Sequence, residues 1–380
     1  MLPCRASFLT TYSEQVASSL LPGAQSLFEE EDPMLGALHA QARACESIGS
    51  AMYTRLFRDL ADDYADNGRT YAILAGRSAR PIHDAIPLRL AAALHRIVLS
   101  GRDERLARHY PSVGGKPGQD FTADFIAYMR DHIDEIDSSL TQQVQTNEVG
   151  RSIVQLTLSH WLTTLNVSDF DYLEVGASAG LNLNFDKYYA CSGQLRMGTQ
   201  SSPVRFMGDC FTHTPNLPRS GARIQRRRGV DISPLDVTQK DHELRLLSFL
   251  WPDQKSRLER TRAAIAIAQQ HPPLIDAGSA DDWIQNQLSR PSDHAVMVFH
   301  SIVWQYLGAG TQSRVREALH NAGMRATPTT PLIWARMEPS GPVADVQVDV
   351  WDGTSEQPRH VRLAEVGYHG QDLKWLVQND

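Results

Sequence analysis

The residues best suited to bind a ligand follow a short apolar segment at Tyr172–Val175. Glu174 lies at the end of this segment, which continues into the small residues Gly176-Ala177-Ser178-Ala179-Gly180 and then Leu181 and Asn182. Small residues allow a ligand to approach the backbone, and the start of a following helix offers N–H groups to polar ligand atoms. The pattern predicts a strand, a ligand-binding turn and a helix. A tight turn without a ligand is the alternative.

A second acidic residue is expected at the end of a second strand. The apolar segment Arg228–Ile232 contains Asp231, whose carboxylate can accept hydrogen bonds from both hydroxyls of a ribose. Two acidic strand ends, Glu174 and Asp231, predict a nucleoside-binding site, to which we also assign Ile232.

His300 is the candidate catalytic residue. It lies near the end of the apolar segment Ala295–Ser301, and open α/β sheets bind ligands at the ends of their strands. The titration range of a histidine suits proton removal from a hydroxyl or amine near neutral pH. A histidine that only packs in the core is the alternative interpretation.

Polar residues before the α/β region form a second candidate group. Asn147, Glu148 and Arg151 lie near an expected helix start, and Gly150 between them leaves room for close approach. We hypothesise that a helical domain contributes these residues, together with Tyr110 of the loop at 110–118, to substrate binding. A helix start with an acidic first turn and an exposed arginine is the alternative.

The run Gly176-Ala177-Ser178-Ala179-Gly180 also fits the G-x-S-x-G elbow of serine hydrolases, in which a serine is the nucleophile. His300 or His369 could then be the base, and Asp293 or Asp345 the acid. A hydrolase also requires an oxyanion-hole loop after an early strand. A helical region precedes the elbow instead, which favours the nucleoside site.

Two patterns divide the chain into a helical part and an α/β part. Up to Leu165, apolar residues recur three and four apart, which predicts helices at Pro33–Leu60, Pro87–Leu99 and Phe121–Leu140. After Asn166, short apolar segments alternate with helical patterns, as in a doubly wound sheet. We expect an all-helical domain at 1–165 and an α/β domain at 166–380, with an insertion around 184–224.

The α/β domain is expected to end in an antiparallel hairpin, because two apolar segments flank Asp352-Gly353. The expected strands are Tyr172–Val175, Arg228–Ile232, Pro273–Ile275, Ala295–His300, Leu332–Met337, Val346–Trp351 and Arg359–Gly367. The helices expected between them are Leu181–Tyr188, Lys240–Leu250, Lys255–Gln270, Asp281–Leu288 and Gln312–Asn321.

Composition excludes several classes of function. The 37 Lys+Arg residues against 44 Asp+Glu give a net charge of -7, so no nucleic-acid partner is expected. The four cysteines lie far apart, without a nearby histidine at metal-ligand spacing, so neither a disulfide framework nor a metal site is predicted. No apolar run is long enough to span a membrane. We expect a cytoplasmic protein with no membrane partner.

The order of these strand ends resembles the class I S-adenosylmethionine-dependent methyltransferase fold, which is Rossmann-like. Over nearly its whole length the chain is also similar to an uncharacterised bacterial family, a domain of unknown function (number 2332). The runs that carry this second resemblance are Tyr110-Pro111-Ser112-Val113-Gly114-Gly115, Gln145-Thr146-Asn147-Glu148-Val149-Gly150-Arg151, Leu173-Glu174-Val175-Gly176-Ala177-Ser178-Ala179-Gly180-Leu181-Asn182 and Trp251-Pro252-Asp253-Gln254.

The methyltransferase resemblance implies S-adenosylmethionine as the cofactor and an unidentified, small-molecule substrate. It places Glu174 near the methionine amino group and Asp231 on the ribose hydroxyls. Gly176, Ser178 and Gly180 are then expected beneath the methionine and ribose, and Ser279, Ala280 and Asp281 at the adenine. Ser178 stands where a second glycine is usual. A non-catalytic nucleoside-binding protein remains the third alternative, since a fold alone does not establish catalysis.

Overall fold

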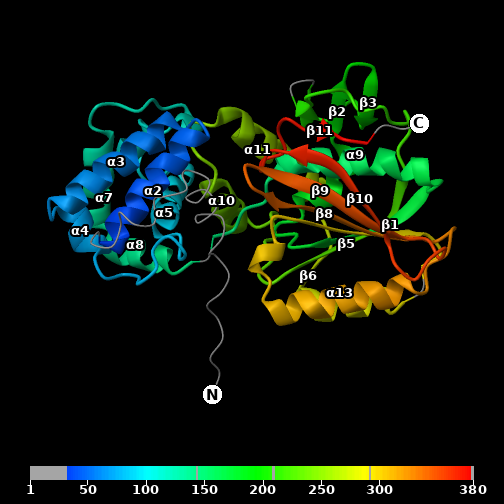
Figure 1. The fold of residues 1–380 in the computed structure, drawn as a ribbon. Helices are drawn as coiled ribbons and strands as arrows, with labels where there is room; N and C mark the ends of the chain where they lie inside the picture. The colour runs from blue at the N-terminus through cyan, green and yellow to red at the C-terminus, as the bar shows by residue number, and fades with distance from the viewer. Residues whose placement is uncertain (1–31, 143, 208–209, 291, 378–380) are drawn as a thin grey trace. The chain divides into compact units, whose positions relative to one another are not determined.

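The computed structural model describes residues 32–142, 144–207, 210–290 and 292–377, so residues 1–31 of the expected helical domain lie outside the described residues. The described chain divides into two compact units (Figure 1). The first contains residues up to 146 together with 240–259, and the second contains residues 147–239 and those from 260 onward. The chain therefore divides at 146, before the expected boundary at 165.

The first unit is helical. Local sequence explains where its helices begin: Asp32 accepts the Met34 N–H at 2.8 Å with Pro33 in the first helical position, and Ser50 caps the next helix. The expected helix Pro33–Leu60 is two helices, because Gly49 adopts a φ of +80° between them. The helices are α2 (Pro33–Ser47), α3 (Ala51–Ala65), α4 (Arg69–Leu74), α5 (Ile86–Leu99), α6 (Glu104–Ala107), α7 (Phe121–Asp131), α8 (Ile133–Leu140) and α10 (Lys240–Ser248).

The segment 240–259 joins this unit although it lies between two strands in the sequence. Asp253 accepts the Ser50 hydroxyl at 2.7 Å and the Met52 N–H at 3.0 Å, at the start of α3. Trp251 is buried in the helical core. The helix expected between the second and third strands, α10, therefore belongs to the helical unit, where it contacts α5.

The second unit is mixed α/β, built on an eight-stranded sheet that is mostly parallel. The strand order is β11-β10-β9-β8-β7-β1-β5-β6. The five strands from β6 to β8 run parallel, and β9, β10 and β11 are antiparallel to their neighbours. The strands are β1 (Asp169–Val175), β5 (Arg223–Asp231), β6 (Ile275–Ala277), β7 (Ala295–Ser301), β8 (Leu332–Ser340), β9 (Val343–Trp351), β10 (Arg359–Val366) and β11 (Lys374–Trp375).

The strand order brings the ends of β1 and β7 together. The chain runs from β1 to β5 and β6 on one side, then places β7 and β8 on the other side of β1. Strands β1 and β7 pair in parallel, with Val175 opposite His300. Such a reversal of strand order leaves space for a ligand beyond the carboxyl ends of the two strands.

Helices cover both faces of the large sheet (Figure 1). On one face, α12 (Ala280–Leu288) and α13 (Ala309–Gly323) pack against Leu173, Val175 and Val298. On the other face lies α9 (Ser152–Leu162), where Gln155 donates to the Tyr172 hydroxyl at 3.0 Å. The remaining helix, α11 (Lys255–Gln270), begins in the first unit and ends in the second.

The expected insertion contains structure of its own. It folds partly into a second sheet of order β3-β2-β4, made of β2 (Tyr189–Ser192), β3 (Leu195–Gly198) and β4 (Arg205–Phe206). The helix expected at Leu181–Tyr188 is the 3-10 helix η5 (Leu181–Lys187).

Among the described residues, no helix combines the length and apolar character needed to cross a bilayer.

Candidate functional site

The turn after β1 is held in shape by backbone hydrogen bonds. The N–H groups of Gly176 and Ala177 donate to the Val230 carbonyl at 2.9 and 3.0 Å, and the Gly180 N–H donates to the Ala177 carbonyl at 2.7 Å. Within this turn Ser178 adopts a φ of +53°, in the left-handed region that costs an L-residue roughly 1–2 kcal/mol. Strain of this kind persists only where the surroundings impose it, and it is common at functional sites.

Asp231 imposes that conformation from the end of β5. Its carboxylate accepts the Ser178 N–H at 2.9 Å and the Ser233 N–H at 2.9 Å. The Leu235 N–H donates to the Ser178 carbonyl at 3.1 Å, so both sides of the serine are held. Asp231 is half-buried, and the neighbouring Ile232 is 57% exposed. The structure therefore brings together the two strand ends that the sequence analysis combined.

Glu174 is a buried carboxyl group next to this turn. Its side chain is almost fully buried, and its Oε2 has no hydrogen-bond partner among the described residues. Burial raises the pKa of Glu174 to about 8, against the attraction of Arg151 and with a smaller contribution from the charge of Asp231. A buried carboxyl oxygen without a hydrogen-bond partner is costly, so a cationic group of a ligand that donates to Oε2 can stabilise it.

The residues Asn147, Glu148 and Arg151 lie beside the same turn, within the α/β unit. Asn147 Oδ1 accepts the Leu181 N–H at 2.8 Å, and Asn182 Nδ2 donates to the Glu148 carbonyl at 3.2 Å. The expectation that the helical domain contributes this group is wrong, because these residues belong to the α/β unit. The N–H groups at the start of this helix were expected to bind a ligand. The Leu181 N–H, however, already donates to Asn147.

Arg151 extends the group toward β7. Its Nε donates to the Tyr368 carbonyl at 3.0 Å and its Nη1 to the Ser301 carbonyl at 3.3 Å. Glu148 pairs with His369, with 3.2 Å between Oε2 and Nδ1. The polar group therefore links the turn after β1, the end of β7 and the C-terminal loop.

The adenine-side residues follow β6, where the Gly278 N–H donates to the Asp231 carbonyl at 3.0 Å, and Tyr110 belongs to the helical unit. Tyr110 is fully buried in the helical unit, where its ring stacks on His95 with centroids 5.5 Å apart. Ala280 belongs to the core between α12 and α13, and Asp281 is buried and accepts Arg314 Nε at 2.5 Å. Ser279 precedes α12 and donates to Asp282. Ser279 therefore has its partner within α12, and Asp281 has its partner on α13.

His300 has a partner that the sequence analysis missed. Its Nδ1 lies 2.6 Å from Oε1 of Glu338 on β8, and its ring stacks on Trp304. Glu338 lies one residue beyond the expected end of its strand. The contact could not be predicted from the sequence, because it depends on the pairing of β7 with β8. Among the residues that the structure describes, His300 Nε2 has no hydrogen-bond partner, so it makes no hydrogen bond to Ser178. The proposed acid Asp345 pairs with Arg362 instead.

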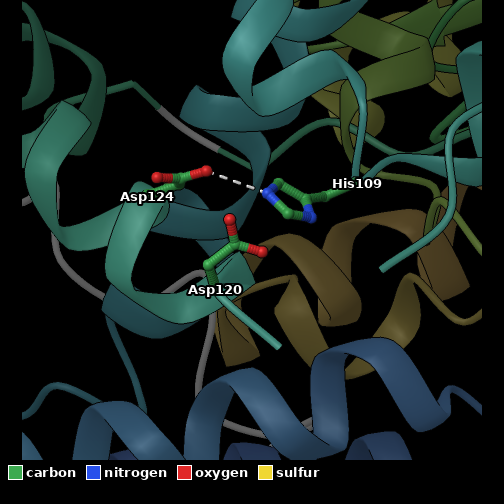
Figure 2. A group of neighbouring side chains, drawn as sticks. All are labelled: His109, Asp120 and Asp124. Carbon is green, nitrogen blue, oxygen red and sulfur yellow. Dashed lines mark hydrogen bonds and ion pairs between the residues drawn. The ribbon is translucent and has the colours of Figure 1, made fainter. Parts of the chain in front are cut away.

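One His/Asp group in the described part of the helical unit has metal-like geometry (Figure 2). The ligand atoms of His109, Asp120 and Asp124 lie within 4.8 Å of one another. However, Arg105 and Arg108 donate to Asp124 at 2.6 and 2.5 Å, and the Gly118 N–H donates to His109 Nδ1 at 3.0 Å. Guanidinium groups already neutralise the carboxylates, so we assign no metal site here.

We expect the group of His109, Asp120 and Asp124 to stabilise the folded protein. Burial opposes ionisation of Asp124, but hydrogen bonds from His109, Arg105 and Arg108 outweigh it and lower the pKa to about 2. The ionised form therefore stabilises the fold above pH 3.8, and this contribution is lost as the pH falls toward 2. Asp124→Asn should lower the free energy of unfolding at pH 7 by roughly 1–3 kcal/mol. Denaturant unfolding measures this.

The exposed neighbour Asp120 provides the matched control, since Asp120→Asn removes a carboxylate that Arg108 contacts in solvent. It should have a much smaller effect. The difference between wild type and Asp124→Asn should shrink between pH 4 and pH 2. A difference that stays constant over that interval contradicts this account of the group.

Comparison with known proteins gives one match. No curated protein and no solved structure matches the chain. A family model described as "Uncharacterized protein conserved in bacteria (DUF2332)" matches residues 36–375, which includes both units and the residues around the β1 turn. The chain therefore belongs to this bacterial family.

Proposed function

We propose that the α/β unit binds S-adenosylmethionine at the carboxyl ends of β1 and β5 and transfers its methyl group to a small molecule. One observation carries the proposal: the buried carboxyl of Glu174, whose Oε2 has no hydrogen-bond partner among the described residues, lies two residues before the small-residue turn at Gly176 that Asp231 holds from the next strand. The parallel strand order β6-β5-β1-β7-β8, continued by antiparallel strands, resembles the Rossmann-like class I methyltransferase fold and supports it.

The available groups fit the parts of this cofactor. Glu174 suits the amino group of the methionine moiety, because an ammonium can donate to the unpaired Oε2 and stabilise the ionised form of the buried carboxyl. The half-buried Asp231 uses one acceptor position on each oxygen for a backbone N–H, and a carboxylate has about four such positions. It can therefore still accept ribose hydroxyls. The exposed side chain of Ile232 next to it offers an apolar surface to a base.

When bound, the cofactor supplies an activated methyl group. The contribution of this chain is then to position the two reactants and to exclude water, which can account for most of the rate of such a reaction. Asp231 and the Ser178 backbone form one rigid unit through their hydrogen bond. Glu174 would hold the ammonium of the bound ligand at the end of β1.

Thermal unfolding in the presence of ligands tests the binding. A ligand at a hundredfold excess over its Kd stabilises the folded state by about 2.7 kcal/mol. We expect S-adenosylhomocysteine to raise the unfolding temperature and NAD at the same concentration to leave it unchanged. An unfolding temperature that S-adenosylhomocysteine does not alter argues against the proposal.

A serine hydrolase is the second candidate, favoured by the positive φ of Ser178 in a G-x-S-x-G run. On our account Ser178 lines the site and is not a nucleophile. Ser178→Gly relieves the positive φ, so it should be at least as stable as wild type and bind S-adenosylhomocysteine within about threefold. A fluorophosphonate probe should leave wild type unlabelled. Stoichiometric labelling that disappears in Ser178→Ala would instead establish the hydrolase.

A further inference from the structure

His300 and Glu338 form a fixed pair at the ends of β7 and β8. Glu338 Oε1 lies 2.6 Å from His300 Nδ1 and also accepts the N–H groups of Val303 and Trp304 at 3.1 and 3.2 Å. Two backbone donors therefore hold the carboxylate in place against the imidazole. The ring itself stacks on Trp304 with 5.1 Å between centroids and 18° between planes.

This geometry determines which nitrogen of His300 carries the proton. A carboxylate only accepts hydrogen bonds, so Nδ1 must donate and Nε2 of the neutral ring keeps a lone pair. His300 is 1% exposed, and Nε2 has no hydrogen-bond partner among the described residues. A buried acceptor that receives no hydrogen bond destabilises the folded protein. A ligand that donates a hydrogen bond to Nε2 removes this cost.

The pair adjoins the turn that we assign to the cofactor. A Cβ atom on Gly176 would lie 2.6 Å from Val303 Cγ2, so only glycine allows the two segments to approach this closely. Ile302, between His300 and Val303, adopts a φ of +51°, which is a rare conformation for a β-branched residue. Strain is thus present at the ends of both β1 and β7, on the two sides of the reversal in strand order.

We propose that Glu338 is a positioning residue that holds His300 in its Nδ1–H form, so that Nε2 accepts the proton of a substrate O–H or N–H. The inference rests on the proposed function, because the deprotonated atom is the nucleophile that receives the methyl group. The substrate O–H or N–H bond breaks and its electron pair stays on oxygen or nitrogen. The proton forms a bond to Nε2, and the resulting imidazolium faces the Glu338 carboxylate.

The surroundings of the imidazole indicate the class of substrate. Trp304 and Trp334 lie 5.1 and 5.9 Å from the His300 ring, centroid to centroid. Arg316 and Arg336 cover the tryptophan rings. Aromatic side chains favour flat, apolar partners. These rings already contact His300, Arg316 and Arg336, so the class we assign is a neutral O–H or N–H donor, for which phenol is the probe.

Nitrogen NMR of the histidine side chains tests the tautomer and the donor separately. In wild type, the His300 signals, identified by their loss in His300→Gln, should show a protonated Nδ1 and an unprotonated Nε2. With S-adenosylhomocysteine present, phenol should shift the Nε2 signal. Anisole, which has the same ring but no O–H, should not. An Nε2–H form in wild type, or equal shifts with phenol and anisole, overturns the proposal.

Glu338→Ala should move the tautomer of His300 toward Nε2–H and weaken the phenol shift, because it removes the acceptor of Nδ1–H, while leaving the Kd for S-adenosylhomocysteine within twofold. Glu338→Gln should keep the Nδ1–H form, because its carbonyl oxygen must still accept the Val303 and Trp304 N–H groups. Asp345→Asn is the matched control, since Asp345 pairs with Glu338 across β8 and β9 but bonds to Arg362. It should keep the wild-type tautomer. An unchanged tautomer in Glu338→Ala refutes the role of Glu338, whereas failure of wild type to bind S-adenosylhomocysteine refutes only the methyl-transfer function.

Discussion

Glu174→Gln is expected to weaken binding of S-adenosylhomocysteine about 10- to 100-fold while making the unliganded protein more stable at pH 8. The loss follows from removing a charged partner of the ligand ammonium, worth about 1.5–3 kcal/mol. The gain in stability follows from burial, which raises the pKa of Glu174 to about 8 from its ordinary value of 4.5. The folded protein therefore retains a proton that the unfolded chain releases.

The sign of the pH dependence follows from this difference. Below pH 4.5 the carboxyl is protonated in both states and its favourable contribution is complete. As the pH rises from 4.5 to about 8 the unfolded chain ionises first, so the wild type loses stability that Glu174→Gln does not lose. The difference in unfolding temperature between variant and wild type should widen over this interval and stay constant above it.

A carboxylate on the same strand provides the control. The pKa of Asp169 is lowered by hydrogen bonds from Ser168 and Gln225, and Arg223 also pairs with it, so Asp169→Asn should not stabilise the protein at pH 8. It should also leave ligand affinity unchanged. If Glu174→Gln shows no gain in stability between pH 4.5 and 8, burial does not raise the pKa of Glu174 and the account of this carboxyl is wrong.

Asp231→Ala is expected to reduce affinity for adenosine and S-adenosylhomocysteine about 10- to 100-fold, because the ribose hydroxyls lose a charged acceptor worth about 1.5–3 kcal/mol. Stability should fall too, since the N–H groups of Ser178 and Ser233 lose their acceptor. Titration with adenosine and 2′,3′-dideoxyadenosine separates the two effects. The variant should weaken only the ligand that carries the ribose hydroxyls.

Asp236→Ala is the matched control in the same loop, because Asp236 bonds to Thr238 and Gln239 instead of the turn. It should bind adenosine like wild type. If Asp231→Ala weakens adenosine and dideoxyadenosine equally, Asp231 acts only by holding Ser178 and does not contact the ribose.

Local patterns predicted the parts of the site that depend on neighbouring residues in sequence. The turn after Glu174 and the acidic end at Asp231 follow from an apolar run, small residues and a carboxylate, and the structure places them in contact. The positive φ of Ser178 could not be predicted from the local sequence. It depends on the hydrogen bonds of Ser178 with Asp231, at the end of β5, and with Leu235, which follows that strand.

Other predictions failed because they depend on which elements pack against one another. The helical pattern of α10 indicates a helix but not the core against which it packs, and the contacts of Asp253 with Ser50 and Met52 decide that. Tyr110 lies in a glycine-rich loop that suggests a binding surface, yet its ring is buried in the helical core. Glu338 became visible only through the pairing of β8 with β7.

The most direct test of cofactor binding is isothermal titration calorimetry of the wild type with S-adenosylhomocysteine at pH 7, in two buffers that differ in ionisation enthalpy. We predict one site per chain, with release of a proton as the ligand ammonium drives ionisation of Glu174, and no binding of NAD. Absence of S-adenosylhomocysteine binding, or tighter binding of NAD, would contradict the account.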